Sequence, residues 1–336
     1  MRIGIVGIGF MGMIHYLASK QLRDAKVVAI ASRDPKKRAG DWTSIRGNFG
    51  PKGSQENLAG IRTYESAEEL IHDPGVDLVD ICLPGDLHAD FAIKALQAGK
   101  HVLVEKPISL KSDSARKMVD AARQANRSLL VAHVLPFFPD FRFALEAVRS
   151  GKYGKPLAAH LRRHTSKRDW SDPTMDITRT GGPIIDLHIH DVHFIGLAFG
   201  RPKSVFSRGR IFKNIVDYVS TQYVFAEGGP TISVAAGSLT QPSREFTHGY
   251  EIYMEQGTLF YEGGSPVTLF TPKGVEHPEI PSLDPVEVFQ QELQYAVDGL
   301  SGKGPIDLLD GSLACESVAI CEKEELSVRT GKEVEL

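Results

Sequence analysis

Lys106 lies at a position where a catalytic or ligand-binding residue would be expected. It lies in the segment His101–Pro107, HVLVEKP, in which a short apolar run gives way to Glu105, Lys106 and a proline. Such a run is typical of a buried parallel strand, and ligands of open α/β sheets bind just beyond the carboxyl ends of these strands. Proline ends the strand ladder and biases Lys106 towards an extended conformation. The pattern predicts either a lysine held at a ligand site or a solvated charge at a strand end.

A second group of polar side chains follows two glycines and a proline, in the segment Gly181–His193. If this segment is helical, Asp186, His190 and His193 lie on one face, and His188 points away. A carboxylate one turn before an imidazole can orient the ring and raise its pKa, which suits a general acid or base near neutral pH. A metal site and a purely structural histidine cluster are the alternatives, although no HExxH pattern or cysteine partner accompanies the histidines.

The start of the chain has the pattern of a dinucleotide-binding turn. The apolar strand Arg2–Val6 runs directly into GIGFMG, and a helical pattern follows. In this context one glycine makes the tight turn, one lets the backbone approach a pyrophosphate, and one packs the helix on the strand. The predicted cofactor contacts of this turn are Gly7, Gly9, Phe10, Met11 and Gly12.

The residues after the next predicted strand, Lys26–Ala31, indicate which dinucleotide is bound. About twenty residues past the glycine turn, NAD enzymes place an acidic residue on the ribose 2′-hydroxyl. This chain has Ser32 and Arg33 there instead. A hydroxyl followed by a guanidinium suits a 2′-phosphate, so the sequence favours NADP. NAD is the alternative, with Arg33 stacked on the adenine.

Positioning these residues requires alternating strands and helices, which the sequence shows as far as residue 135. This alternation predicts a doubly wound parallel sheet of the Rossmann type over residues 1–135. The predicted strand Val76–Leu83 ends near three candidate cofactor contacts, which are Leu83, Pro84 and His88. For His88, helix capping or packing is an alternative. The glycine-rich segment 40–60 lacks periodicity and is predicted to be a surface loop, an inert insertion in preference to a cofactor cover.

Beyond residue 135 the sequence changes to long β-rich runs separated by glycine-rich turns. Six such runs lie between Leu157 and Tyr261, and helical patterns follow at 285–300 and 308–326. We therefore predict an α/β chain whose second domain, residues 136–336, is α+β with a large, mostly antiparallel open sheet. Its last helix is expected to pack back on the first domain. One sheet face would serve the substrate and the other a partner subunit.

The composition excludes several classes of partner. The 336 residues carry a net charge of −3, with 42% hydrophobic and 24% charged residues. This charge argues against nucleic-acid binding, and no polybasic segment or run of 18 apolar residues suggests a membrane. Three irregularly spaced cysteines and the absence of a signal-like start predict a reducing, cytoplasmic location.

Taken in order, these motifs resemble the Gfo/Idh/MocA oxidoreductase family over essentially the whole chain. The matching segments are the glycine turn, Leu83–His88, Ala98–Val102 with Glu105–Pro107, and the helix with Asp186 and His190. The resemblance implies that His190 exchanges a proton with a substrate hydroxyl, Lys106 polarises or relays it, and Asp186 positions the substrate or the histidine. It also implies Glu105 and Lys106 near the cofactor, and a homodimer or homotetramer formed through the second-domain sheet.

Clues to the substrate are few. Gly85 stands where the family often has asparagine and His188 where it often has glycine, so substrate contacts there can be unusual. A basic and aromatic cluster after the first second-domain strand suits a sugar ring with a carboxylate or phosphate, with a solvated loop as the alternative. The candidate substrate contacts are His133, Arg162, Arg168, Trp170 and His188.

The function predicted from these features is hydride transfer between a nicotinamide and a carbinol or carbonyl carbon. The substrate would be a sugar, polyol, inositol or sugar acid, and its hydroxyl proton needs a base. Two alternatives stay open: a glycosidase that oxidises its sugar transiently with bound NAD, and a nucleotide-binding regulator without chemistry. The intact Lys106, Asp186 and His190 argue against the regulator but not against the glycosidase.

Overall fold

The computed structural model describes residues 1–166 and 177–336, which form two compact units. The first unit comprises Met1–Ser109, Asp113–Phe137 and Leu283–Cys315, and the second comprises Leu110–Ser112, Phe138–Ser282 and Glu316–Leu336. Two predicted substrate contacts, Arg168 and Trp170, lie outside the described residues. Within the described parts, no helix is both long and apolar enough to cross a membrane.

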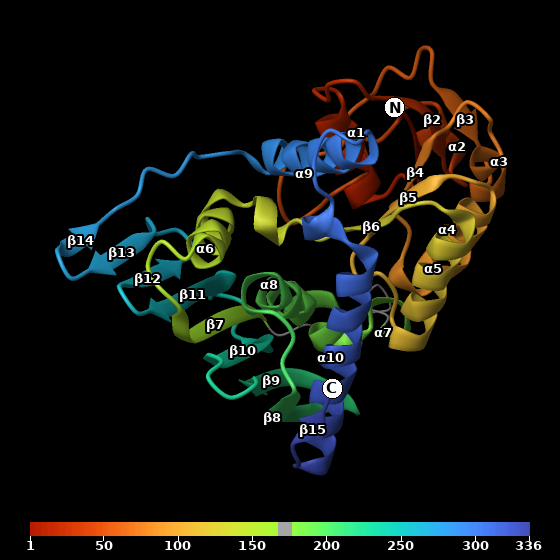
Figure 1. The fold of residues 1–336 in the computed structure, drawn as a ribbon. Helices are drawn as coiled ribbons and strands as arrows, with labels where there is room; N and C mark the ends of the chain where they lie inside the picture. Colours follow the sequence, from red (N-terminus) through yellow and green to blue (C-terminus); the bar gives the residue numbers. More distant parts are fainter. Residues whose placement is uncertain (167–176) are drawn as a thin grey trace. The chain divides into compact units, whose positions relative to one another are not determined.

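A parallel six-stranded sheet forms the centre of the first unit (Figure 1). Its strand order is β3-β2-β1-β4-β5-β6, which reverses direction at β1 as a doubly wound sheet does. The strands are β1 Arg2–Val6, β2 Lys26–Ala31, β3 Arg62–Tyr64, β4 Leu78–Ile81, β5 His101–Glu105 and β6 Leu129–Ala132. The apolar residues of β4 and β5 are at most 1% exposed, so the central strands are covered on both faces. The predicted Rossmann-type sheet is confirmed.

Helices of the first unit come from both ends of the chain. They are α1 Phe10–Ser19, α2 Pro35–Arg38, α3 Ala67–Ile71, α4 His88–Gln97, α5 Ser112–Ala125 and α9 Pro285–Leu300. The late helix α9 packs against α1 (Figure 1), and its Phe289 ring lies 5.8 Å from that of His15. Asp284 begins α9 with a capping box that pairs it with Glu287, the local signal that also made this helix predictable.

The segment 40–60 contains no helix or strand, as expected, but aromatic side chains anchor it to the first unit. Trp42 is fully buried with its ring 4.8 Å from that of Tyr16, and Phe49 stacks on Phe289 at 5.7 Å. Gly47 lies so close to Phe10 that a Cβ would come within 1.9 Å of the Phe10 ring. The segment is therefore a packed part of the first unit, and the choice of an inert insertion over a cofactor cover stays a prediction.

The second unit contains a nine-stranded, mostly antiparallel sheet. Its order is β14-β13-β12-β11-β7-β10-β9-β8-β15, with a parallel pair only between β7 and β10. The strands are β7 Pro156–Ser166, β8 Ser204–Phe212, β9 Ile215–Val224, β10 Thr231–Thr240, β11 Thr247–Met254, β12 Gly257–Glu262, β13 Thr268–Thr271, β14 Gly274–Glu276 and β15 Val334–Glu335. The six predicted β-rich runs correspond to β7 to β12, which confirms the predicted open sheet.

One face of this sheet carries helices, among which α8 contacts β7 (Figure 1), while the π-helix before α8 contacts β9 and β10. The helical elements are α6 Pro139–Ser150, α7 Ile177–Thr180, a π-helix Ile184–His188, α8 Ile189–Phe199 and α10 Gly311–Thr330, whose first residues belong to the first unit. Side chains alternate between the two faces of each strand, so neighbours such as Arg162 and Arg163 point in opposite directions.

Candidate functional site

The glycine turn has the backbone geometry that a dinucleotide requires. Gly7 has φ +95°, and a Cβ on it would meet the Cys82 carbonyl oxygen at 2.7 Å. A Cβ on Gly12 would meet the Gly7 oxygen at 2.0 Å, so this glycine allows α1 to pack on the turn. Gly9 has no atom within 4 Å of its Cβ position, which leaves open space at the position expected to approach a pyrophosphate. The three glycines thus differ in surroundings as the predicted roles require.

The amino end of α1 is available to an anion. Gly9 is the N-cap residue, no side chain caps the helix, and its first turn contains no acidic residue. Helix amides without a side-chain acceptor, together with the positive end of the helix dipole, favour a phosphate. Phe10 and Met11 are half-buried, and the Phe10 ring lies 4.8 Å from that of Phe49. The residues present therefore fit a dinucleotide at this turn.

Hydrogen bonds between side chains and the backbone fix the turn after β2. The Arg38 guanidinium donates to the Ser32 carbonyl at 2.7 Å and to the Arg33 carbonyl at 3.0 Å. Ser32 Oγ accepts from the Asp34 amide at 3.3 Å, while Asp34 caps α2. The Arg33 side chain is exposed and forms no ion pair with another described residue. A rigid turn with a solvated guanidinium is suited to binding an anionic group.

His88, which follows β4, is buried between backbone carbonyls. Its Nδ1 lies 2.8 Å from the Pro107 oxygen and its Nε2 lies 2.7 Å from the Leu83 oxygen. The ring is 1% exposed, and burial lowers its pKa. Both nitrogens thus lie within hydrogen-bond distance of a carbonyl oxygen, and the neutral ring donates to one of the two. This placement between two loops favours the packing alternative over contact with nicotinamide or ribose. Leu83 and Pro84 lie in the same loop, beside Gly7, at the carboxyl end of β4.

Lys106 directly follows β5 and is half-buried, with a cis peptide bond to Pro107. The Glu105 carboxylate faces inward: it is 6% exposed, its Oε2 accepts from the Lys106 amide at 3.0 Å, and its Oε1 lies 3.2 Å from His15 Nε2. This placement favours a supporting role for Glu105 over the predicted cofactor contact. His133, predicted to touch substrate, is 1% exposed in the same unit, a burial that does not favour that role.

A buried polar cluster that we did not predict lies behind Glu105. His15 Nδ1 is 2.9 Å from Asp80 Oδ2, and the Cys82 sulfur is 3.6 Å from both His15 and Asp80. These three residues have the ligand types of a metal site, with their atoms within 4.8 Å of one another. Their separations, however, are those of hydrogen bonds among the His15 Nδ1, carboxylate and thiol, so these groups partner one another, whereas His15 Nε2 faces the Glu105 carboxylate at 3.2 Å. Burial raises the pKa of the Cys82 thiol, which keeps it protonated.

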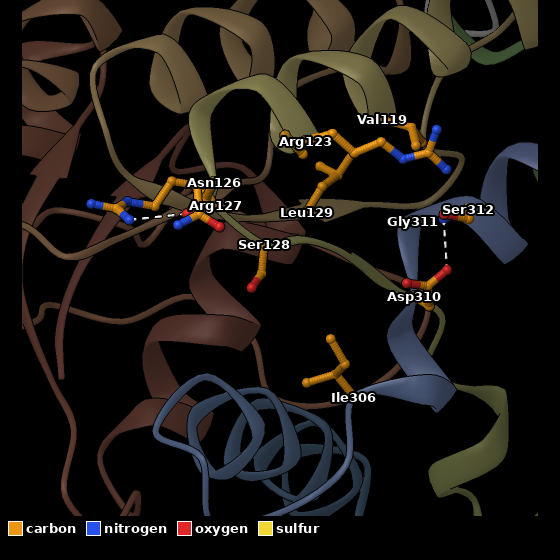
Figure 2. Close-up of a pocket in the computed structure, with 11 residues that line it drawn as sticks. Val119, Arg123, Asn126, Arg127, Ser128, Leu129, Ile306, Asp310, Gly311 and Ser312 are labelled. Carbon is orange, nitrogen blue, oxygen red and sulfur yellow. Dashed lines mark hydrogen bonds between the residues drawn. The ribbon is translucent and has the colours of Figure 1, made fainter.

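A pocket of about 330 Å³ in the first unit contains none of the predicted site residues (Figure 2). It lies beside Leu129, the first residue of β6. The pocket is therefore at the amino ends of the strands, whereas the glycine turn is at their carboxyl ends. The Asp310 carboxylate accepts from the Ser312 amide at 2.8 Å and so occupies the amino end of α10. Its negative charge disfavours an anion there, and we do not assign this pocket to the candidate site.

In the second unit, Asp186 and His190 flank a change of helix type. Residues Ile184–His188 form a π-helix, not the start of the continuous α-helix that we predicted, and α8 begins at Ile189. Asp186 and His190 are both half-exposed, whereas His188 and Ile189 are buried. Short π-helical turns are frequent at functional sites, because they shift side chains away from α-helical register.

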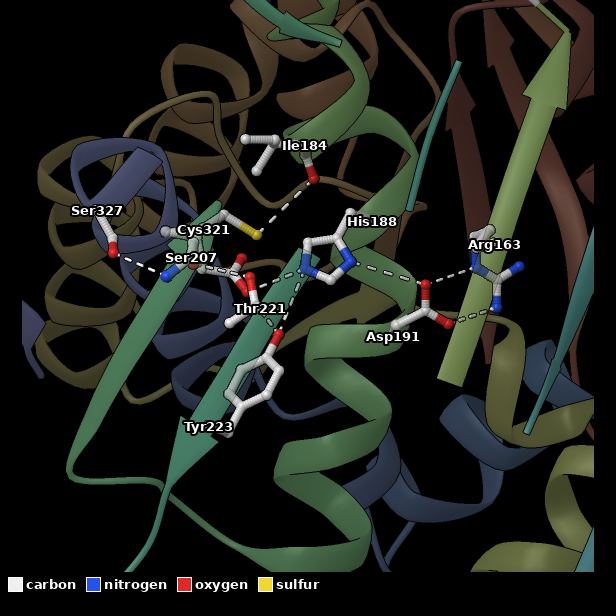
Figure 3. Close-up of polar contacts among 10 residues, drawn as sticks. Arg163, Ile184, His188, Asp191, Ser207, Thr221, Tyr223, Cys321 and Ser327 are labelled. Carbon is white, nitrogen blue, oxygen red and sulfur yellow. Dashed lines mark hydrogen bonds and ion pairs between the residues drawn. The ribbon is translucent and has the colours of Figure 1, made fainter. Parts of the chain in front are cut away.

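His188 belongs to a buried network (Figure 3). Its Nε2 lies 3.0 Å from Glu324 Oε1, which also accepts from the Tyr223 hydroxyl at 2.6 Å. Burial alone would lower the pKa of His188, but Glu324 and Asp191 outweigh it and raise the pKa to about 9. His188 is therefore an imidazolium in the core at neutral pH. Its 1% exposure does not favour the predicted substrate contact.

An ion pair on the other side of His188 joins α8 to the sheet (Figure 3). The Arg163 guanidinium, on β7, donates to both oxygens of Asp191 at 2.9 Å, and both side chains are buried. Burial would raise the pKa of Asp191, but the Arg163 charge lowers it well below its usual value. This bidentate geometry fixes the first turn of α8, and with it the position of His190.

Two further residues of the second unit, His193 and Arg162, differ from His190 in their surroundings. Burial lowers the pKa of His193 to about 3, so this fully buried ring is neutral and does not share the half-exposed position of His190. Arg162 lies on the sheet face opposite α8 and pairs with Glu262 on β12 at 3.1 Å. Because its neighbour Arg163 points to α8, strand alternation excludes Arg162 from that face. The predicted substrate contact at Arg162 is therefore not supported.

Comparisons with known proteins find relatives for both units. One family model, described as an oxidoreductase family with an NAD-binding Rossmann fold, matches residues 1–133. A second, the GFO/IDH/MocA C-terminal domain, matches residues 141–260. Myo-inositol 2-dehydrogenase of Thermotoga maritima is 33% identical over 63% of this chain and 59% of its own length. Inositol 2-dehydrogenase of Rhizobium meliloti is 25% identical over 97% of this chain and 99% of its own length.

Solved structures support the same fold. Levoglucosan dehydrogenase, in complex with NADH and L-sorbose, is 19% identical, covers 100% of this chain and 98% of its own, and superimposes with a TM-score of 0.85. A probable dehydrogenase from Thermotoga maritima is 22% identical with the same coverage of both chains and has a TM-score of 0.82. Together with the two family models in chain order, these matches identify the chain as a member of the Gfo/Idh/MocA oxidoreductase family.

Proposed function

We propose that this protein transfers a hydride between NAD(P) and a carbinol or carbonyl carbon of a sugar, polyol, inositol or sugar acid. The observation that carries the proposal is the glycine turn, in which Gly7 and Gly12 are sterically required and Gly9 faces open space. A family described by NAD binding and inositol dehydrogenases among the relatives support the reaction class. The names of these relatives support a polyhydroxylated ring as substrate.

We propose that Lys106, Asp186 and His190 form the catalytic group. When bound, the nicotinamide supplies the hydride donor or acceptor. Oxidation of a carbinol needs its hydroxyl proton removed, and the half-exposed His190 imidazole is placed on α8 to take that proton. Asp186 is half-exposed one turn earlier and would orient that ring or a substrate hydroxyl. The Lys106 ammonium would stabilise negative charge on the reacting oxygen.

The proposal is tested by near-ultraviolet absorbance of purified protein with NAD and NADP in turn, against aldoses, inositols and sugar acids. Dinucleotide reduction with one of these substrates is the expected result. Absence of turnover, with a dinucleotide released only on denaturation, would instead favour the transient-oxidation glycosidase, which glycoside cleavage without net reduction would establish. Binding without either reaction would favour a regulator.

We infer a preference for NADP from the turn after β2. Arg33→Ala is expected to raise the KM for NADP roughly 10- to 100-fold and to leave the KM for NAD nearly unchanged, because a hydrogen bond to a charged group contributes about 1.5–3 kcal/mol. Initial rates with both dinucleotides measure this effect. Lys36→Ala removes a neighbouring exposed charge and serves as the control. Equal losses for NAD and NADP in Arg33→Ala would contradict the preference.

We also propose that the sheet face opposite α8 joins subunits into a homodimer or homotetramer. This outer face is defined by register: Phe206, Val224 and Phe270 lie on it and are 38%, 38% and 44% exposed. The half-buried Ala235 lies near its middle, paired with Arg162 on β7. Apolar side chains at the edges of a face with a small residue at its centre suit a flat, closely packed interface.

Light scattering tests this assembly. The native protein is expected at twice or four times 36.8 kDa, and Ala235→Arg is expected to shift it towards 36.8 kDa, since a long charged side chain would be buried without a partner. Leu326→Arg, which adds the same charge at an exposed apolar site on α10, should leave the mass unchanged. A native mass of 36.8 kDa would refute the interface.

The three free cysteines are consistent with the proposed reducing, cytoplasmic location.

A further inference from the structure

Polar contacts connect the buried cluster of the first unit to the backbone of Lys106. Glu105 is the last residue of β5, and one of its oxygens accepts from the Lys106 amide at 3.0 Å. The other oxygen lies 3.2 Å from His15 Nε2, and His15 Nδ1 lies 2.9 Å from Asp80. A chain of polar contacts thus runs from Asp80, through the imidazole and the Glu105 carboxylate, to the backbone of Lys106.

Each member of this chain is fixed by a different element. His15 comes from α1, Asp80 from β4 and Glu105 from β5, and their exposed fractions are 0%, 1% and 6%. Burial alone would lower the pKa of His15, but the Asp80 carboxylate outweighs it and the pKa is raised well above its usual value. The hydrogen bond between His15 Nδ1 and the Asp80 carboxylate fixes the ring, and the ring in turn places its Nε2 3.2 Å from the Glu105 carboxylate, within ion-pair distance.

Glu292 of α9 completes the surroundings of the cluster. It is fully buried, and neither of its carboxyl oxygens makes a hydrogen bond with another described residue. Burial raises its pKa well above the usual value, and the neighbouring Glu105 and Asp80 carboxylates add to this effect. Glu292 therefore holds none of the other three side chains by a hydrogen bond.

We propose that Glu105 is a positioning residue, which His15 and Asp80 hold in place and which fixes the peptide at Lys106 so that the lysine side chain leaves the strand in one direction. This inference rests on the proposed catalytic role of Lys106. Glu105 acts on the lysine through the backbone amide of Lys106, because a hydrogen bond from this amide restrains the backbone from which the side chain projects. Misplacement of a catalytic group by about 1 Å can cost 100-fold in rate.

The test compares Glu105→Gln with Glu105→Leu. Glutamine keeps an acceptor for the Lys106 amide and loses the charge, so kcat should fall no more than about tenfold; leucine loses both contacts, and kcat should fall about 100-fold. The Kd for the dinucleotide should stay within about twofold in both. Asp73→Asn is the matched control, because Asp73 is a buried acid of the same unit that pairs with Arg62. It should leave kcat unchanged.

A double-variant cycle separates positioning from general damage. If Glu105 acts through Lys106, Glu105→Leu should have no further effect on kcat in a Lys106→Ala background. Independent of activity, hydrogen exchange at the Lys106 amide should be faster in Glu105→Leu than in the native protein. Additive losses of kcat, or unchanged amide exchange, would overturn the inference. If Lys106→Ala itself kept full turnover, the proposed function of Lys106 would fail first, and amide exchange would still report on the contact.

Discussion

Asp191→Leu is expected to lower the free energy of unfolding by about 3–5 kcal/mol, because it leaves a guanidinium buried without its partner. Arg163 donates to both Asp191 oxygens, and each side chain is at most 5% exposed. Asp191 also lies 3.8 Å from the His188 imidazolium, so the same change takes a compensating charge from a second buried cation. Equilibrium denaturation in guanidinium chloride, followed by far-ultraviolet circular dichroism, measures the loss.

The control for this prediction removes both partners. Arg163→Met with Asp191→Leu replaces the pair by apolar side chains, and its loss should be smaller than that of Asp191→Leu alone, because no unpaired charge stays buried. A single-variant loss below about 1 kcal/mol would contradict the argument, as it would match only an exposed pair. A double variant less stable than the single one would mean that packing of Arg163 against the aromatic ring of Phe141, 5.8 Å away, dominates.

Lys106→Ala is expected to lower kcat about 10²- to 10⁴-fold, the range for loss of a group that assists proton transfer or stabilises developing charge. The Kd for the dinucleotide should change far less, because the glycine turn and the amino end of α1 supply the phosphate contacts. Steady-state rates and a separate binding titration measure the two quantities. A similar loss in both would mean that the lysine binds the cofactor and does not act in the chemical step.

Two further variants sharpen this prediction. Lys106→Arg keeps a cation but cannot give up a proton near neutral pH, so recovery of rate in this variant would assign electrostatic stabilisation, and continued loss would assign proton relay. Lys94→Ala is the control for charge removal: Lys94 pairs with Asp90 and Glu68 on the surface of the same unit. Its rates should match those of the native protein.

Local rules explain what could be predicted from the sequence. The assignments to Gly7, Gly9 and Gly12 depend on the conformation of a single turn, and short apolar runs identified the central strands. Helix α9 was predictable with its bounds, because Pro285 and the preceding capping residue mark its start and a glycine-containing turn follows it. Each of these signals lies within a few residues of the feature that it specifies.

The buried networks could not be predicted, because their members are far apart in the sequence. His188 meets Glu324 from 136 residues away, and His15 meets Asp80 from 65 residues away. Strand alternation could have separated Arg162 from Arg163, but which of the two faced inward depended on the partner that α8 supplies. The π-helix has no composition signal of its own, since its hydrogen bonding is set by how the segment packs on β9 and β10 before α8.

The π-helix at Ile184–His188 also bears on how the orientation of the residues before α8 can change in evolution. A π-helical turn contains one residue more than the α-helical turn that it replaces. Deletion of one residue there would restore α-helical winding and rotate everything that precedes it by about 100° relative to α8. Side chains that precede the π-helix would then face a different side, while the core contacts of α8 stayed intact. The direction in which those side chains point is therefore encoded in chain length as well as in residue type.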